Sequence, residues 1–376
     1  MINQKLFIDI LEQNGINFFT GVPDSFLNAF CNYIKENIPQ ERNIIAANEG
    51  NAVAIASGYS FGKDVLPLVY MQNSGIGNAV NPLVSLADVN VYSVPMVLLI
   101  GWRGGPKSGD REQHKTQGEI TPALMEVMNI PYKILEDDDN LLAETVAWAS
   151  STAKAKKCPV ALIADKGVFT GAKAPIVDTS FPLSREEAMA AVLDVAPQNA
   201  IFSATTGRAA RELHSLRDER GEDHGHDFLN VGSMGHASSV ALGMALACPE
   251  RQVICFDGDA AAIMHMGSFT TDGKVQPPNL MHIILNNGMH ESVGGQPSAG
   301  RIADFTAIAK ACGYATVDYP VNDKESLQKA VKELLAKEKP TFIDAQIHAG
   351  LRPDLVPLRV DHNAIIDELR KELREN

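Results

Sequence analysis

Short apolar runs alternate with segments of helical periodicity along the first half of the chain. The runs that predict strands are Ile16–Thr20, Ile44–Ala46, Leu66–Met71, Met96–Ile100, Tyr132–Leu135 and Val160–Ala164. Helix-length segments separate most of them, and the amphipathic stretch Lys5–Gln13 precedes the first run. Because strands that alternate with helices form a parallel sheet covered on both faces, residues 1–170 predict a doubly wound α/β domain.

The same alternation begins again at Ser184. The runs that predict strands in this half are Ala200–Ser203, Phe228–Val231, Gln252–Phe256, Leu280–Leu285, Thr316–Asp318 and Thr341–Gln346. Between the halves, residues 171–183 contain two prolines and little periodicity, which is typical of a linker. A chain of 376 residues is also longer than one ordinary hydrophobic core supports. We therefore predict two α/β domains, residues 1–170 and 184–376, of about six strands each, with a single large sheet as the alternative.

Polar residues follow two of the predicted strands in the second half. Gly258-Asp259 comes one residue after the run that ends at Phe256, and Asn286-Asn287 directly follows the run that ends at Leu285. Because neighbouring parallel strands end at the same edge of a sheet, Asp259 and Asn287 should lie side by side although they are 28 residues apart. Either segment alone would be interpreted as a turn. Their joint occurrence at this spacing favours a ligand site.

The residue types at this edge suit a magnesium ion. Mg²⁺ takes an octahedron of hard oxygen ligands and usually accepts few carboxylates. The Asp259 carboxylate, the Asn287 amide oxygen and the backbone carbonyl of Met289 would leave room for diphosphate oxygens and water. We therefore predict an Mg²⁺ site with a diphosphate as its other ligand.

This pair of segments resembles the cofactor motif of the thiamine diphosphate-dependent decarboxylase family, Gly-Asp-Gly followed by Asn-Asn. Ala260 stands where the family has its last glycine, which requires a backbone conformation open to a residue with a side chain. The later stretch Gly294–Ser298 is similar to the branch that contains the phosphonopyruvate and sulfopyruvate decarboxylases. The resemblance covers nearly the whole chain. It implies a pyrimidine-binding first domain, a diphosphate- and Mg²⁺-binding second domain and no middle domain.

In this family a glutamate hydrogen-bonds N1′ of the aminopyrimidine ring, and the resemblance assigns this role to Glu49. Glu49 lies between the run Ile44–Ala46 and a helix of small residues, Asn51–Gly58. A carboxylate in such an apolar, water-poor site has a raised pKa and makes strong hydrogen bonds. The alternative is a glutamate at a helix N-terminus that the helix dipole favours. Gln72 and Asn73 resemble the loop that receives the pyrimidine.

Two further segments of the second half resemble cofactor-binding loops. In Gly232-Ser233-Met234, Met234 matches the large side chain that supports the bent cofactor, and the Gly232 carbonyl would accept from its 4′-amino group. A methionine is otherwise ordinary core filler. Thr205-Thr206-Gly207 follows the run Ala200–Ser203 and precedes a helix, where hydroxyls and amides can hold diphosphate oxygens. A helix N-cap without a ligand is the alternative there.

The resemblance implies that the substrate side of the site contains Asp24 and His114, and His290 is a further candidate that could equally be a solvated surface group. Asp24, in the turn after the first strand, could relay protons or only cap the next helix. His114 lies in the glycine-rich loop 101–118, and His290 directly follows the metal motif. A terminal phosphonate or sulfonate also requires a cation, for which arginine has the matching geometry. The candidate cations are Arg103, Lys107 and Arg352, each of which could equally be a solvated surface group.

Composition and charge narrow the possible partners. Hydrophobic residues make up 45% of the chain and charged residues 21%, as in globular proteins that are neither disordered nor membrane-embedded. The net charge of −13, without a basic stretch, argues against nucleic acid or an anionic membrane as a partner. The N-terminus lacks a basic segment followed by a long apolar run, and the five scattered cysteines contain no CxxC pair. We therefore expect a cytoplasmic protein without disulfides or a zinc site.

With these observations, the resemblance implies a decarboxylase of a small-molecule 2-oxo acid that uses thiamine diphosphate and Mg²⁺ as cofactors. It also favours a terminal phosphonate, as in phosphonopyruvate, over sulfopyruvate, because Asn286 stands where the sulfonate enzymes often carry Asp and Met289–Val293 precedes the two glycines. Because the family binds its cofactor between subunits, the resemblance implies a homo-oligomer with the cofactor at the subunit interface. Glu49 argues against an inactive regulatory subunit, and the lack of an early GxGxxG after a strand argues against a dinucleotide-dependent dehydrogenase.

Overall fold

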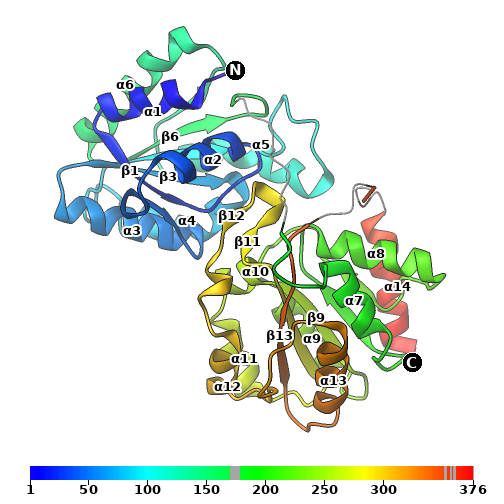
Figure 1. Cartoon of the computed structure of the whole chain (residues 1–376). Helices are drawn as coiled ribbons and strands as arrows, with labels where there is room; N and C mark the ends of the chain where they lie inside the picture. Colours follow the sequence, from blue (N-terminus) through cyan, green and yellow to red (C-terminus); the bar gives the residue numbers. More distant parts are fainter. Residues whose placement is uncertain (170–177, 351–353, 356–357, 359–360, 376) are drawn as a thin grey trace. The chain divides into compact units, whose positions relative to one another are not determined.

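The computed structural model of the chain describes residues 1–169, 178–350, 354–355, 358 and 361–375. The chain forms two compact units. Unit 1 is Met1–Pro175 with Ser292–Gln296, and unit 2 is Ile176–Glu291 with Pro297–Asn376. Figure 1 labels many of the elements of each unit. Part of the predicted linker, residues 171–177, lies outside the described residues, so the exact domain limits stay a prediction.

Unit 1 is built on a six-stranded sheet in which every neighbouring pair of strands is parallel. Its strands are β1 (Ile16–Gly21), β2 (Asn43–Ile45), β3 (Leu66–Gln72), β4 (Met96–Gly101), β5 (Tyr132–Leu135) and β6 (Pro159–Ala164). Its helices are α1 (Gln4–Gln13), α2 (Asn28–Asn37), α3 (Glu49–Gly62), α4 (Ile76–Ser85), α5 (Glu112–Val127) and α6 (Asp139–Lys156), with the 3-10 turns η1 (Gln40–Arg42) and η2 (Asn73–Gly75). The strand order is β2-β1-β3-β4-β6-β5.

Side chains of the first sheet alternate between two cores, one on each face. On β3, Leu66, Leu68 and Tyr70 pack with α1, α2 and α6. Val69 and Met71 of the same strand pack on the other face with α3, α4 and α5. Because successive strand residues point to opposite faces, a run that is apolar at every position must be covered on both sides. The predicted doubly wound arrangement is therefore confirmed for unit 1.

Unit 2 is built on a five-stranded parallel sheet, and the described residues also form a small two-stranded sheet. Its strands are β7 (Ile201–Ala204), β8 (Asp227–Leu229), β9 (Val253–Gly258), β10 (Leu280–Asn286) and β13 (Thr341–Gln346), and the small sheet pairs β11 (Met289–His290) with β12 (Gln296–Pro297). Its helices are α7 (Arg185–Leu193), α8 (Ala209–Arg220), α9 (Ala237–Ala247), α10 (Asp259–Met264), α11 (Ser268–Val275), α12 (Phe305–Ala311), α13 (Lys324–Leu334) and α14 (His362–Glu375), with the 3-10 turns η3 (Glu291–Val293) and η4 (Ala299–Arg301). The main sheet has the order β13-β10-β9-β7-β8.

The second sheet also carries helices on both faces. On β9, Ile254 and Phe256 pack with α7, α8 and α13. Val253 and Cys255, on the other face, pack with α9 and α14. This alternation again follows from the two-residue period of a strand. Among the described residues, no helix combines the length and the apolar composition that crossing a bilayer requires.

One predicted strand is wrong. Thr316–Asp318 is not in a strand, and its neighbourhood contributes only isolated bridges from Ala315 and Val321 to β13. The main sheet of unit 2 therefore has five strands instead of about six. Pro320 has no N–H to donate to a ladder, and the Asp318 side chain is 86% exposed, so this short segment touches the edge strand without extending the sheet.

The strand order reverses between β1 and β3 in the first sheet and between β7 and β9 in the second. In open α/β sheets, ligands bind outside the carboxyl ends of the strands at such a switch point. The segments that follow these strands are therefore where each unit can build a binding site.

Candidate active site

Glu49 is the first residue of α3 and is 5% exposed. The helix begins there because the Asn48 side chain accepts from the backbone N–H of Asn51 at 2.9 Å. The Nδ2 of Asn78 donates to Glu49 Oε2 at 2.8 Å. Burial raises the pKa of Glu49, and the Asn78 hydrogen bond offsets this only in part. The structure thus provides a buried carboxylate that favours its protonated form more than an exposed glutamate does.

Glycine backbone forms the wall next to this carboxylate. A Cβ on Gly75 would lie far inside van der Waals contact with the Glu49 carboxylate. A Cβ on Gly50 would lie 2.7 Å from the backbone oxygen of Asn78, the residue that donates to Glu49. Both positions therefore require glycine because of close approach, although neither has a positive φ.

Asp24 lies in the segment after β1 and is fully buried. Its Oδ2 accepts from the backbone N–H of Phe26 at 2.8 Å and of Leu27 at 3.3 Å, as a turn carboxylate does. Its Oδ1 accepts from Gln72 Nε2 at 2.5 Å. The Gln72 oxygen in turn accepts from Ser74 Oγ at 2.7 Å. Asp24 and Gln72 therefore form one connected hydrogen-bonded pair at the ends of β1 and β3.

Asn73 connects the end of β3 to the segment after β4. Its Nδ2 donates to the backbone oxygen of Arg103 at 2.8 Å and to Thr121 Oγ1 at 3.0 Å. Its Oδ1 accepts from the backbone N–H of Arg103 at 3.1 Å. The Asn73 amide is thus bonded within the protein at both ends, which makes its side chain a support for the loop.

Arg103, a candidate cation, is already paired. Its guanidinium donates two hydrogen bonds to Asp110, at 2.5 and 2.6 Å, and a third to Ser25 Oγ at 3.0 Å. Burial alone would raise the pKa of Asp110, but the hydrogen bonds and charge of Arg103 lower it to about 2. The Arg103 charge is therefore largely neutralised by Asp110, which the sequence did not suggest.

The remaining candidates near the loop 101–118 differ in their surroundings. His114 is half-buried on α5, and its Nδ1 has no hydrogen-bond partner among the described residues. Burial, followed by the charge of Arg103, lowers the pKa of His114, so the neutral imidazole is favoured. The Lys107 side chain is exposed, and its backbone N–H donates to Asp165 at 3.0 Å. Arg352 lies outside the described residues.

In unit 2, Asp259 is the first residue of α10 and is 2% exposed. Burial raises its pKa to about 6, although the Ser298 hydroxyl donates to its Oδ2 and the charge of Arg301 favours ionisation. Gly300 lies directly against the Asp259 carboxylate, where a Cβ would not fit. The turn η4 thus covers a carboxylate whose ionisation is opposed by its burial.

The register of β9 and β10 pairs Gly258, the last residue of β9, with Leu285, so Asp259 and Asn287 begin the segments that leave the sheet at one edge. The Nδ2 of Asn286 donates to the backbone oxygen of Gly300, the residue packed on Asp259, at 2.8 Å. Both side chains therefore lie beside the same turn. The structure brings the two ends of the predicted metal motif to one edge of the sheet, as parallel strands require.

Asn287, the other predicted metal ligand, is 5% exposed. Its Nδ2 donates to Glu291 Oε2 at 3.0 Å, and its Oδ1 accepts from the backbone N–H of Met289 at 3.2 Å. The neighbouring His290 is half-buried, and burial lowers its pKa to about 4. His290 is therefore a neutral imidazole at neutral pH.

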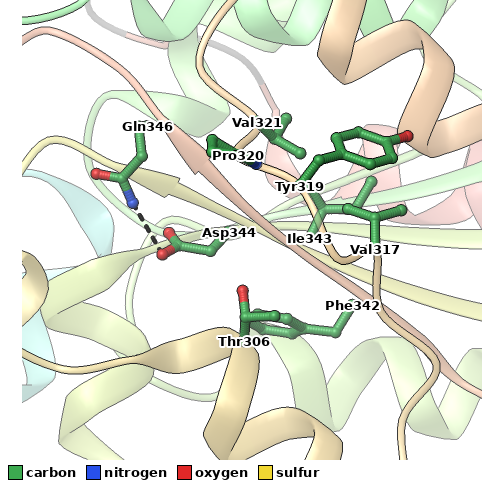
Figure 2. Close-up of a pocket in the computed structure, with 9 residues that line it drawn as sticks. All are labelled: Thr306, Val317, Tyr319, Pro320, Val321, Phe342, Ile343, Asp344 and Gln346. Carbon is green, nitrogen blue, oxygen red and sulfur yellow. Dashed lines mark hydrogen bonds between the residues drawn. The ribbon is translucent and has the colours of Figure 1, made fainter.

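A second acid, the half-buried Asp344 on β13, lies close to this edge. It accepts from Asn286 Nδ2 at 3.1 Å and from Gln346 Nε2 at 2.8 Å. Burial, together with the negative charge of Asp259, raises the pKa of Asp344 to about 6. Figure 2 shows Asp344 and Gln346 at the polar end of a small pocket lined otherwise mostly by apolar side chains. Asp259 and Asp344 thus place two carboxyl groups of raised pKa at this edge, and the charge of Arg301 compensates for this only in part.

The loop after β7 has the features of an anion site. Thr205 is buried, and its Oγ1 has no hydrogen-bond partner among the described residues. Thr206 and Gly207 follow at the start of α8, with φ of +102° at Gly207. A Cβ at Gly207 or Gly258 would meet open space. An unpaired hydroxyl beside open backbone can donate to a phosphate oxygen.

The segment after β8 is shaped by residues of positive φ. Ser233 is exposed with φ of +48°, and Gly235 has φ of +84°. A Cβ on Gly235 would lie 2.7 Å from the His265 ring, so this glycine is required for packing as well as for conformation. Between them, Met234 is half-buried, and the Gly232 N–H donates to Asn230 at 3.1 Å. Met234 therefore retains an exposed part that a ligand could contact.

Comparison with known proteins identifies the class to which this fold and these strand ends belong. Residues 2–126 match the thiamine pyrophosphate enzyme N-terminal TPP binding domain, and residues 205–345 match the C-terminal TPP binding domain. The phosphonopyruvate decarboxylase of Streptomyces viridochromogenes is 32% identical over 92% of this chain and 90% of its own length. The chain therefore belongs to the family of thiamine pyrophosphate enzymes.

Two further relatives have similar names. The phosphonopyruvate decarboxylase of Streptomyces hygroscopicus is 32% identical over 93% of this chain and 88% of its own length. The sulfopyruvate decarboxylase of Methanosarcina acetivorans is 29% identical over 93% of this chain and 91% of its own length. These matches confirm the resemblance seen in the sequence and the two-domain α/β fold without a middle domain.

Several residues that shape the site had no assigned role in the sequence analysis. They are Asn78, Asp110, Glu291, Ser298 and Asp344. Four of them, with Asp110 in the loop 101–118, lie within or just beyond stretches that the sequence analysis covered, so their position was a usable signal. Asp344 gave none, because its partner Asn286 is 58 residues away along the chain.

The close packing of Gly75 on Glu49 generates a prediction. Gly75→Ala should weaken thiamine diphosphate binding by about tenfold or more, because the new methyl must displace the Glu49 carboxylate or the loop that carries it. Isothermal titration of both proteins with the cofactor and Mg²⁺ measures the change. Gly77→Ala is the matched control, since a Cβ there would meet nothing within 4 Å and affinity should not change. Equal affinity in both variants would contradict the placement of Glu49 at the cofactor.

Proposed function

We propose that the chain is a thiamine diphosphate- and Mg²⁺-dependent decarboxylase that converts 3-phosphonopyruvate to phosphonoacetaldehyde and CO₂. The observation that carries this proposal is the match to phosphonopyruvate decarboxylases along nearly the whole chain. It is supported by the buried Glu49 in unit 1 and the buried Asp259 in unit 2, each at the carboxyl end of its sheet.

The proposed Mg²⁺ ligands are the Asp259 carboxylate, the Asn287 amide oxygen and the backbone oxygen of Met289. The residues fit a divalent cation because the buried Asp259 and the half-buried Asp344 each have a raised pKa, with the charge of Arg301 only partly compensating. A hard cation bound at Asp259 would supply the positive charge that these two carboxylates lack. Carboxylate, amide and carbonyl oxygens are the ligands that Mg²⁺ accepts.

For the diphosphate we propose the loop Thr205-Thr206-Gly207 and the backbone of Gly258 and Ala260. The fit is supported by the unpaired, buried Oγ1 of Thr205, which lacks an acceptor within the described part of the chain. The N-terminus of α8 adds backbone N–H groups with a favourable dipole. Met234 and the Gly232 carbonyl are proposed to contact the thiazolium and aminopyrimidine portions, respectively.

When bound, thiamine diphosphate supplies an electron sink for the electron pair left as CO₂ departs. We propose that Glu49, whose pKa is raised by burial, donates a hydrogen bond to N1′ of the aminopyrimidine ring. Its raised pKa suits this task, because a neutral amide, Asn78, is its neighbour instead of a cation. Gln72 and Asn73 fix the loop around this ring through the hydrogen bonds that occupy their amides.

We propose that polar side chains of unit 1 bind the substrate. The neutral His114, with an unpaired Nδ1, can donate to or accept from the reacting oxo acid. Arg103 is oriented by Asp110 and by Ser25, so a phosphonate would bind beside a positioned guanidinium. Asp24 is proposed to act through Gln72, and His290 and Lys107 remain candidates for contact with the anion.

A second candidate substrate is sulfopyruvate, because the chain is also similar over 93% of its length to the sulfopyruvate decarboxylase of Methanosarcina acetivorans. A sulfonate is a tetrahedral anion of similar shape with one charge less at neutral pH. The expectation of a homo-oligomer with the cofactor at the subunit interface rests on the family resemblance alone and stays a prediction.

The substrate proposal is tested by steady-state assay of purified protein with each acid. We expect release of CO₂ and aldehyde from phosphonopyruvate only when thiamine diphosphate and Mg²⁺ are both present. The kcat/KM for phosphonopyruvate should be at least about tenfold above that for sulfopyruvate, which corresponds to about 1.4 kcal/mol of differential transition-state binding. A higher kcat/KM for sulfopyruvate would show that sulfopyruvate, and not phosphonopyruvate, is the preferred substrate. Turnover of neither acid would contradict the proposed function.

The role of Glu49 is tested by Glu49→Gln. This change keeps the shape of the side chain and removes its acidic proton, so decarboxylation should fall by about 100-fold or more while cofactor binding stays measurable. Glu36→Gln, an exposed position on α2, is the matched control and should leave turnover unchanged. Undiminished kcat in Glu49→Gln, measured by CO₂ release, would rule out the assigned role.

The pKa of Asp259 predicts how Mg²⁺ binding depends on pH. Burial raises the pKa to about 6, so the metal-free folded protein favours the protonated acid below pH 6 and the carboxylate above it. Because Mg²⁺ binds only the carboxylate, the apparent affinity should be about tenfold weaker at pH 5 than at pH 7 and constant above pH 7. Titration calorimetry with Mg²⁺ across this range measures it. A flat profile would show that Asp259 is not a ligand.

The raised pKa of Asp259 also affects the stability of the metal-free protein. In the metal-free protein, the contribution of Asp259 is fully present below the ordinary aspartate pKa and is lost as the pH rises through about 6. Added Mg²⁺ should therefore raise the melting temperature more at pH 7 than at pH 5, which thermal denaturation can follow alongside the titration.

A further inference from the structure

The carboxylate of Glu291 is the centre of a buried network in unit 2 and is 6% exposed. Its Oε2 accepts from Arg185 Nη1 at 2.9 Å and from Asn287 Nδ2 at 3.0 Å. Its Oε1 is paired with Arg208 Nη1 at 2.7 Å and accepts from the Gly350 N–H at 2.7 Å. The four donors come from the start of α7, the loop before α8, the segment after β10 and the segment after β13.

The two arginines are themselves held in place. Arg185 donates two hydrogen bonds to Glu212, at 2.6 and 2.9 Å, which leaves one nitrogen for Glu291. Arg208 also donates to the backbone oxygen of Glu291 at 3.3 Å. The network therefore balances two guanidinium groups with two carboxylates, and its charges are paired although they are buried.

This network decides which way the Asn287 amide faces. A carboxylate that receives hydrogen bonds from two guanidinium groups offers only acceptor oxygens, so it must face the amide nitrogen of Asn287. The amide oxygen then points to the other side, where the Met289 N–H donates to it at 3.2 Å. Without Glu291 the amide could rotate and present its NH₂ group instead. An NH₂ group cannot bind a cation.

We propose that Glu291 is a positioning residue for the metal site, which turns the Asn287 oxygen toward Mg²⁺ and is itself fixed by Arg185 and Arg208. The inference rests on the proposed function, in which Asn287 is an Mg²⁺ ligand. Glu291 does not touch the metal. Glu291 keeps the neutral Asn287 amide in the one orientation that binds a cation. Replacing Glu291 should therefore lower Mg²⁺ affinity more than it lowers the rate of the chemical step.

Two variants test this. Glu291→Asp keeps a negative charge for the two arginines but is one methylene too short to hold them and Asn287 together, and Glu291→Gln removes the charge. In both, Mg²⁺ affinity measured by titration calorimetry with thiamine diphosphate present should fall by about 10- to 100-fold, as for other groups that orient metal ligands. The KM for Mg²⁺ in the decarboxylase assay should rise equally, while kcat at saturating Mg²⁺ stays within about threefold of wild type.

Asp227→Asn provides the control for a purely structural effect. Asp227 is fully buried in unit 2, and its carboxylate receives two hydrogen bonds from Arg217, at 3.0 and 2.9 Å. This variant breaks a comparable ion pair that makes no hydrogen bond to Asn287. It should lower the melting temperature and leave the Mg²⁺ dissociation constant within about twofold of wild type.

Unchanged Mg²⁺ affinity in a folded Glu291→Asp or Glu291→Gln protein would overturn the proposal. An equal loss of affinity in Asp227→Asn would overturn it too, because the effect would then come from general destabilisation. Circular dichroism and the melting temperature establish that each variant is folded. Failure of the wild-type protein to bind Mg²⁺ would instead contradict the proposed function, and with it the role of Asn287 as a ligand.

Discussion

The buried carboxylate of Asp259 is the constraint around which unit 2 is arranged. Removing a carboxylate from water opposes its ionisation, and the Ser298 hydroxyl and the charge of Arg301 compensate only in part. Asp344 adds a second acid near the same edge. The fold therefore concentrates negative charge where two parallel strands end. A divalent cation relieves this cost, which is why the chemistry of the site and its electrostatics lead to the same proposal.

In unit 1 the buried carboxylates of Glu49 and Asp24 are bonded to neutral amides, whereas Asp259 in unit 2 lies near a second acid. Glu49 is bonded to an amide, and glycine backbone packs against it, so burial raises its pKa without a cation to lower it. Asp24 is bonded to Gln72, and Arg103 is paired with Asp110. Each polar group at the ends of β1, β3 and β4 thus has a partner from the next segment. Such satisfied networks hold loops rigidly, which suits a site that must orient a ring and a small acid.

Much of the fold could be predicted from the sequence because the strands are buried on both faces. A run such as Met96–Ile100 is apolar at every position, and the structure places it at the centre of its sheet. The prediction was wrong for Thr316–Asp318, which lies beside the edge strand β13 but is flanked only by isolated bridges to it. Composition indicates local burial, whereas a strand also needs a continuous ladder, which depends on how the rest of the chain positions the segment.

For the site, the sequence by itself determined which residues stand at the strand ends, because chain order fixes that Asp259 follows β9 and that Asn287 follows β10. Only the tertiary structure decided which groups form hydrogen bonds with each of these side chains. Arg185 meets Glu291 although they are 106 residues apart, and their contact orients Asn287. Hydrogen bonds depend on distances of a few ångströms between side chains from separate elements. A linear pattern contains no such distances, so the partners emerge only when the sheets and helices pack.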